Sequence, residues 1–292
     1  MQSSLTSPGR VSGVKVYITA DMEGITGLVD AQDVQPAGRD YERGRVMMAE
    51  DVNAAVRGAF AAGASDVLVN DAHGPGRNLL HDQLDPRARL IKGGGKRMGM
   101  LEGLDASFDA ALCVGYHSRA GALGVMSHSF MGHEIEDMWL DDRPVGEIGM
   151  VHGTSAALGV PVLMLTGDDA ACDEAEKWEG SVATVAVKNV RHRFAAELVP
   201  AAAAREMIES AAKNAVAGCE GQRREPVRVP DPVTLAVRWQ SASVAAHLQG
   251  IPGVQARDSR TVEATGHMAD LWPLFGIFMR VAGNLTGNHP YC

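Results

Sequence analysis

The chain has 292 residues, of which 46% are hydrophobic, and a mean hydropathy of −0.07, so it is long enough to fold as one large or two medium globular domains. Acidic residues outnumber basic ones by 36 to 27, which gives a formal net charge of −9. This balance makes nucleic acids and anionic membranes poor partners. A membrane span is also not expected, because no run of about 18 apolar residues is present.

Two features favour a cytoplasmic protein. Residues 1–13 lack the apolar core of a signal peptide, and we expect them to form a flexible N-terminal segment. The four cysteines, Cys113, Cys172, Cys219 and Cys292, are scattered without a Cys-x-x-Cys pair. Cys113 lies within an apolar run, where a reduced and buried thiol is the ordinary expectation.

The first elements of the chain follow the order strand, helix, strand. The apolar run Val14 to Thr19 predicts the first strand, and apolar residues at helical spacing predict a helix from Tyr41 to Ala62, which Gly63 ends. A second strand over Val67 to Val69 completes a βαβ unit, whose crossover is right-handed. The sequence therefore predicts an α/β fold with a mostly parallel sheet.

Strands and helices continue to alternate toward the C-terminus. The predicted strands lie at 88–91, 110–114, 161–165, 182–187 and 233–239, and the predicted helices at 146–158, 169–179, 200–217 and 268–282. Residues 218–232 are rich in charge and helix breakers and look like a connection. We therefore predict a three-layer α/β domain over residues 14–198, which is the part of the chain that carries the candidate metal-ligating and catalytic residues described below. A smaller α/β or α+β domain, with an oligomerisation region, is predicted over residues 199–292.

Five candidate metal ligands stand at or near the ends of apolar runs. Asp21 and Glu23 follow the first predicted strand, His73 follows the second, His117 follows the strand that ends at Val114, and Glu147 opens a predicted helix. In an open α/β sheet the ligand crevice lies outside the carboxyl ends of the strands, so four segments can deliver these side chains to one crevice. Each residue alone also has an ordinary explanation as a turn residue or a helix N-terminal carboxylate.

The types of candidate ligand suggest a catalytic rather than a structural metal site. Carboxylates mixed with imidazoles suit Zn²⁺, with Mn²⁺ or Co²⁺ as substitutes, and no thiolate stands near them in the sequence. Five such ligands are enough for two metals that share a bridging carboxylate, as in two-metal hydrolases. His128, about ten residues beyond His117, is compatible with three roles: a further ligand, a general base or a nucleophile. Spacing does not choose among them.

The glycine-rich run from Gly93 to Arg97 is a weaker signal. It lacks the spacing of a phosphate-binding loop, and no serine or threonine follows Lys96. We expect a flexible turn there. The apolar stretch from Met268 to Met279 is too hydrophobic to lie bare on a soluble monomer, so it is either an oligomer contact or a core helix.

Eight ordered blocks between about Val14 and about Lys188 resemble the motifs of the zinc-dependent D-aminopeptidases of the DppA type. The blocks are ITADMEGITG, YERGR, VLVNDAHG, MLEGLD, GYHSRA, GVMSHSF, DRPVGEIG and PVLMLTGDD. The resemblance implies a self-compartmentalising homodecamer of two-domain α/β subunits, with two zinc ions in each site. It also implies a metallo-aminopeptidase that releases N-terminal residues, D-amino acids such as D-Ala, from short peptides.

The same resemblance implies a role for each site residue. Asp21 would bridge the two metals, Glu23 and His73 would complete one zinc site, and His117 and Glu147 would complete the other. His128, from the matching HS pair, would be the catalytic nucleophile or base. The segment FMGHEIEDMWL departs from the family pattern, and the shape of the pocket depends on it.

Two other functions are consistent with the same ligands. One is a two-metal aminopeptidase or amidase that acts on L-residues or on non-peptide amides, because stereochemical preference resides in pocket walls that the motifs do not define. The other is a non-catalytic protein that binds peptide in a metal-dependent way. The presence of His128 argues for an enzyme.

Overall fold

The larger of two sheets forms the centre of the molecule. The structure, a computed structural model, describes residues 13–219 and 224–287, so the predicted flexible segment, apart from Gly13, and Cys292 lie outside the described residues. The strands of this sheet run in the order β3-β2-β1-β4-β7-β8-β9 and are parallel except for β9, which is antiparallel to β8. They are β1 (Val14–Ala20), β2 (Ala64–Asp71), β3 (Arg89–Ile91), β4 (Ala110–Tyr116), β7 (Val162–Asp168), β8 (Ala183–His192) and β9 (Ala195–Leu198).

The smaller sheet is antiparallel, with the order β11-β12-β10-β5-β6. Its strands are β5 (Ile135–Leu140), β6 (Arg143–Pro144), β10 (Val233–Trp239), β11 (Gln255–Ala256) and β12 (Thr261–Gly266). The chain therefore enters this sheet between β4 and β7, returns to the larger sheet, and comes back after residue 232. The domain boundary near residue 198 stays a prediction. Strands β5 and β6 of the smaller sheet precede this position, whereas the helix that follows it packs on the larger sheet.

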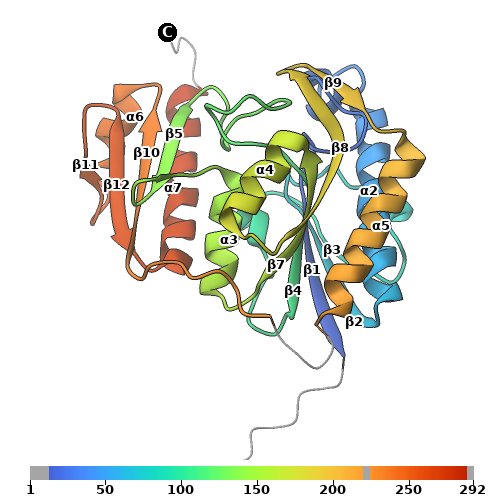
Figure 1. Cartoon of the computed structure of the whole chain (residues 1–292). Coiled ribbons are helices and arrows are strands. Elements are labelled where there is room, and N and C mark those ends of the chain that lie inside the picture. The colour runs from blue at the N-terminus through green and yellow to red at the C-terminus, as the bar shows by residue number, and fades with distance from the viewer. Residues whose placement is uncertain (1–12, 220–223, 288–292) are drawn as a thin grey trace, which may run out of the picture.

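Helices cover both faces of the larger sheet. Figure 1 shows α2 and α5 side by side on one face, and α3 and α4 on the other, with the smaller sheet and α7 beyond α3. The helices are α1 (Ala31–Val34), α2 (Tyr41–Ala61), α3 (Glu147–Ala157), α4 (Asp169–Trp178), α5 (Ala201–Ala217), α6 (Ala242–Leu248) and α7 (Met268–Thr286), with 3₁₀ turns at His81–Gln83 and Gly99–Leu101. No helix in the described part of the chain is long and apolar enough to cross a membrane.

Two hydrophobic cores follow from this layering. Successive side chains of a strand point to opposite faces, so Val16 and Ile18 join the core under α2 and α5, whereas Tyr17 joins the core on the other side. The second core also contains Trp239 of the smaller sheet and Phe275 of α7. Because the two sheets share this core, the second sheet is fixed against the first.

The predicted α/β fold with a mostly parallel sheet is confirmed, and the apolar stretch Met268 to Met279 is a core helix. Leu271, Trp272, Phe275 and Phe278 of α7 are buried, whereas Ile277 is 44% exposed. The hydrophobicity of this segment is therefore explained within one chain, and it gives no separate support for assembly.

Candidate metal centre

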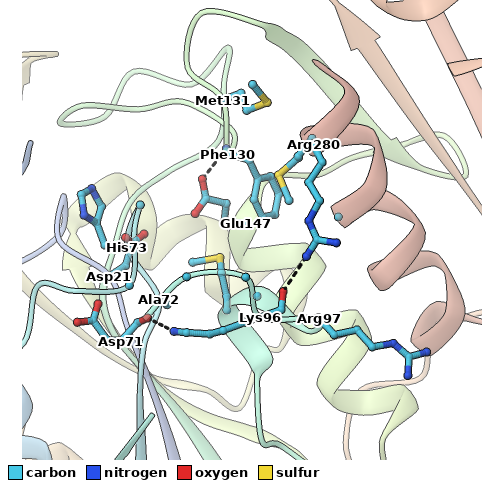
Figure 2. Close-up of a pocket in the computed structure, with 18 of the residues that line it drawn as sticks. Asp21, Asp71, Ala72, His73, Lys96, Arg97, Phe130, Met131, Glu147 and Arg280 are labelled. Carbon is cyan, nitrogen blue, oxygen red and sulfur yellow. Dashed lines mark hydrogen bonds between the residues drawn. The ribbon is translucent and has the colours of Figure 1, made fainter. Parts of the chain in front are cut away.

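All six residues singled out in the sequence meet at the carboxyl ends of the central strands. The turn after β1 carries two of them, the loops after β2 and β4 carry three, and the start of α3 carries the last. In chain order they are Asp21, Glu23, His73, His117, His128 and Glu147. Figure 2 shows the side chains of Asp21, His73 and Glu147 around the same end of a pocket.

The first group of potential ligands consists of Asp21, Glu23 and His73. Their ligand atoms lie within 4.8 Å of one another. Nε2 of His73 is 3.1 Å from Oε1 of Glu23. Both carboxylates are almost fully buried, and one oxygen of Asp21, Oδ1, accepts a hydrogen bond from the backbone N–H of Met22 at 2.9 Å. The other oxygen, Oδ2, has no hydrogen-bond partner among the described residues.

The second group consists of His117, His128 and Glu147, again with ligand atoms within 4.8 Å of one another. Nε2 of His117 lies 3.3 Å from Oε1 of Glu147 and 3.6 Å from Oδ2 of Asp21. Asp21 therefore contacts both groups, which is the position that a bridging carboxylate needs.

Several ligand atoms in this site are buried without a hydrogen-bond partner among the described residues. They are Oδ2 of Asp21, Oε2 of Glu23 and Nε2 of His117. Buried polar atoms are ordinarily hydrogen-bonded, and an unpaired one destabilises the fold. Carboxylate oxygens and imidazole nitrogens are also the atoms that coordinate Zn²⁺. The donor set therefore fits divalent metal ions.

The pKa shifts of the buried carboxylates in the metal-free protein also favour a site for cations. Burial, together with the charges of Glu23 and Glu147, raises the pKa of Asp21 well above its usual range. Burial alone would also raise the pKa of Glu23, but the charge of His73 and its hydrogen bond lower that pKa well below its usual range. Three buried carboxylates thus crowd one site, and bound cations would neutralise them.

His128 is held with one ring nitrogen free. Its Nδ1 donates to the backbone carbonyl of Met126 at 2.9 Å, and its ring stacks on His117 at a centroid distance of 4.2 Å. Burial, and next the charge of His117, lower the pKa of His128, which favours the neutral ring with a lone pair on Nε2. That nitrogen is 3.8 Å from Oε1 of Glu147. The geometry suits a general base, and it also leaves the role of a third ligand open.

The loop that carries His128 has an unusual backbone. Met126 and Phe130, on either side of it, have positive φ angles of 51° and 55°. Such angles cost roughly 1–2 kcal/mol per residue outside glycine. Phe130 is tied down by its N–H, which donates to Oε1 of Glu147 at 2.6 Å, and by ring contacts to Trp272 and Phe275. The position of His128 is therefore linked to Glu147 and to α7.

Asn78 supports His73, and no sequence pattern had pointed to it. Its Nδ2 donates to Oδ1 of Asp71 and to the backbone carbonyl of His73, each at 2.7 Å. Its Oδ1 accepts from the hydroxyl of Tyr41 at 2.8 Å and lies 3.4 Å from Nδ1 of His73. This arrangement places the Nδ1 proton of His73 toward Asn78, so that Nε2 faces Glu23. Outer partners of this kind orient metal-binding histidines.

Lys188 of β8 supports the turn after β1. It is fully buried, and its Nζ donates to the backbone carbonyls of Glu23, Ile25 and Leu28 at 2.6, 2.9 and 2.5 Å. Burial lowers its pKa to about 8. The available sequence signal for this role is a lysine inside the apolar strand VAVKNV, where a charged side chain needs buried partners.

The metal-binding groups open into a cavity of about 490 Å³. Its far wall consists of α7, through Trp272, Met279 and Arg280, and of residues 93–97. The glycine-rich run is a turn, as expected. It also lines the pocket, which no sequence pattern had indicated. Nζ of Lys96 anchors the run by donating to Oδ1 of Asn70 at 2.8 Å and to the backbone carbonyl of Asp71 (Figure 2).

Comparison with known proteins agrees with this geometry. The family model described as D-aminopeptidase matches residues 14–277. A D-aminopeptidase from Bacillus subtilis (strain 168) is 40% identical over 249 residues, which are 85% of this chain and 89% of that protein. A solved structure, the Zn-dependent D-aminopeptidase DppA from Bacillus subtilis, described as a self-compartmentalizing protease, matches with a TM-score of 0.89 and 34% identity. That match covers 96% of this chain and 100% of the other. Together, the extent of the family match and the identity to a relative show that the chain belongs to the D-aminopeptidase family.

Proposed function

We propose that this chain is an aminopeptidase with two zinc ions per subunit, which releases N-terminal D-residues from short peptides. The observation that carries the proposal is the position of Asp21, whose unpaired Oδ2 lies between the Glu23–His73 group and the His117–Glu147 group. The zinc identity is supported by the mixed carboxylate and imidazole donors and by the Zn-dependent relative. The preference for D-residues is supported by the names of the relatives.

The metal ligands and His128 would have separate roles in the reaction. Zinc ions held by the five ligands would supply the Lewis acidity that polarises the scissile carbonyl and activates a water molecule. His128 presents Nε2 with its lone pair, so it can accept a proton during attack and return it to the leaving amine. The free amino group of a peptide N-terminus can bind one of the metals or a nearby carboxylate at this end of the cavity. Cleavage is thereby directed to the first residue.

We also propose that ten subunits assemble around an enclosed chamber that admits only short peptides. This proposal is supported by the self-compartmentalizing relative, whose whole length this chain matches. Ten chains of 30.9 kDa have a mass of about 309 kDa, which light scattering can measure. A monomeric mass, or rapid trimming of a folded protein, would contradict the chamber. A cytoplasmic location is proposed from the buried, free thiols of Cys113 and Cys172.

The function is tested with paired D-alanyl and L-alanyl dipeptides and zinc-loaded protein. We expect the D-alanyl peptide to be cleaved with the higher kcat/KM, and a chelator to abolish cleavage. Faster cleavage of the L-alanyl peptide would identify an enzyme for L-residues. Binding of either peptide without release of alanine would identify a peptide-binding protein instead.

A further inference from the structure

Acidic and basic side chains both line the active-site cavity. The carboxylates of Asp21, Glu23 and Glu147 lie at the metal end, where bound zinc ions would offset their charge. Three cationic side chains also line the cavity, those of Lys96, Arg97 and Arg280. The ammonium group of Lys96 lies against Asn70 and Asp71 at the end of β2, whereas Arg280 projects from α7.

Of the three cations, Arg280 has the most freedom to bind a ligand inside the cavity. Nζ of Lys96 is engaged by Asn70 and by the backbone carbonyl of Asp71. Figure 2 shows Arg97 pointing away from Asp21 and His73, whereas Arg280 descends from α7 toward the backbone of Lys96. The polar contact of the Arg280 guanidinium is a long one, with Nη2 donating to the carbonyl of Lys96 at 3.4 Å. Among the described residues, it has no carboxylate partner.

The base from which Arg280 projects is firmly held. Trp272, two turns earlier on α7, donates from Nε1 to the carbonyl of Met98 at 2.8 Å, and its ring contacts Phe130. Lys96, in the glycine-rich run, is thus fixed to β2, and Met98, just beyond the run, is fixed to α7. A guanidinium has five N–H donors in a planar fork, so most of the donors of Arg280 remain available. By contrast, Arg238 and Arg260 of the smaller sheet are both paired with Glu136.

We propose that Arg280 binds the free C-terminal carboxylate of the substrate, so that the enzyme selects short peptides with an ammonium group at one end and a carboxylate at the other. A planar guanidinium matches a carboxylate through two parallel N–H···O bonds. With the carboxylate held on α7, the amino end of the peptide would face the metal centre, as the proposed function requires. This inference rests on the proposed function, because it names the substrate class of the same site.

The test compares D-Ala-D-Ala with its C-terminal amide, which has the same shape but no negative charge. The wild-type protein should cleave the free acid with a kcat/KM about 10- to 100-fold higher, the range for a hydrogen-bonded charge. In Arg280→Met the kcat/KM for the free acid should fall by about the same factor, chiefly through KM, while the value for the amide changes little. Arg280→Lys, which keeps the charge but not the fork, should fall between the two.

A surface arginine supplies the matched control. Arg39, beside Asp40 at the start of α2, is 83% exposed in its side chain and does not line the cavity, so Arg39→Met removes the same charge elsewhere. It should keep the wild-type preference for the free acid. Equal cleavage of acid and amide by the wild type would overturn the proposal. So would an equal loss on both substrates in Arg280→Met, since that would indicate a structural role.

Binding measurements separate this inference from the proposed function. Calorimetry with zinc-loaded protein can compare the free acid and the amide of a hydrolysis-resistant peptide whether or not the protein cleaves. If no peptide is cleaved but Arg280→Met removes the binding preference for the free acid, the proposed function fails and the carboxylate site stands. If peptides are cleaved and the variant binds both forms as the wild type does, the function stands and the site fails.

Discussion

At the scale of single residues, Asp21 joins the two halves of the metal centre. One of its oxygens is fixed by the N–H of Met22, and the other is buried and unpaired, 3.6 Å from His117. The remaining ligands each contact one half. The consequences of removing a ligand should therefore differ between Asp21 and the histidines.

We predict that Asp21→Ala loses both zinc ions, whereas His73→Ala chiefly weakens the site that it shares with Glu23. A bridging carboxylate serves two cations and a terminal imidazole serves one. Metal analysis of the purified variants measures this difference. Asp21→Ala with two zinc ions per chain would show that Asp21 is only a turn residue.

The role of His128 is decided by a second substitution. We predict that His128→Ala retains its zinc and loses at least about 100-fold in kcat, the loss expected for a positioned acid–base group. Metal content and kcat are measured on the same sample. A metal-depleted variant would make His128 a ligand, and a metal-replete, fully active one would make its role structural.

At the scale of elements, β8 holds the metal-binding turn after β1 through one side chain. Lys188 donates to three carbonyls of residues 23–28, although β4 and β7 separate its strand from β1 in the sheet. Gly24 allows the end of β4 to approach the turn after β1 closely. A Cβ at Gly24 would lie 2.0 Å from the backbone oxygen of Tyr116, so the turns after β1 and β4 pack backbone against backbone.

We predict that Lys188→Met weakens zinc binding at the Glu23–His73 half of the site by about 10- to 100-fold, as for other partners that orient metal ligands. The substitution leaves three buried carbonyls without their donor, so the turn loses its fixed shape. Competition with a chelator measures the affinity of each half. Lys213→Met, at an exposed position on α5, is the control and should bind zinc as the wild type does. Equal weakening of both halves would point to a general loss of folding instead.

At the scale of the whole molecule, the metal centre lies where the layers meet. The turns of the larger sheet supply four ligands, the start of α3 supplies Glu147, and α7 closes the cavity. Buried carboxylates repel one another when no cation is bound. Metal binding should therefore stabilise the entire fold, not only the site.

We predict about two zinc ions per chain in protein purified without chelator, and a lower melting temperature after their removal. A ligand that binds only the folded state stabilises it by about 2.7 kcal/mol when its concentration is 100 times its Kd. Calorimetric melting with and without chelator, followed by addition of zinc, measures the shift. One zinc ion or none, or a melting temperature that chelation leaves unchanged, would contradict a binuclear centre built from buried ligands.

The sequence by itself determined most of the longer elements and the choice of candidate ligands. Local periodicity predicted β1, α2, β10 and α7 because it reflects which side of a single element is buried, and it placed Asp21, Glu23, His73 and His117 after strands of one parallel sheet. Their convergence then followed from the general rule for such sheets. The strands β5 and β6 were not predicted, since short, half-polar segments acquire their structure from pairing, β5 with β10 and β6 with β5.

Only the tertiary structure decided what surrounds the ligands. Lys188 and Arg280 reach the site or its cavity through partners distant in the chain, and no local pattern encodes those contacts. Asn78 contacts the nearby His73 but is itself held by the distant Tyr41. The same holds for α7, which was predicted as a helix but whose apolar face could equally have met another subunit. Whether it packs inside the chain depends on the space left between two sheets. Local sequence sets the shape of each element, whereas the packing of all elements together sets the shape of the pocket.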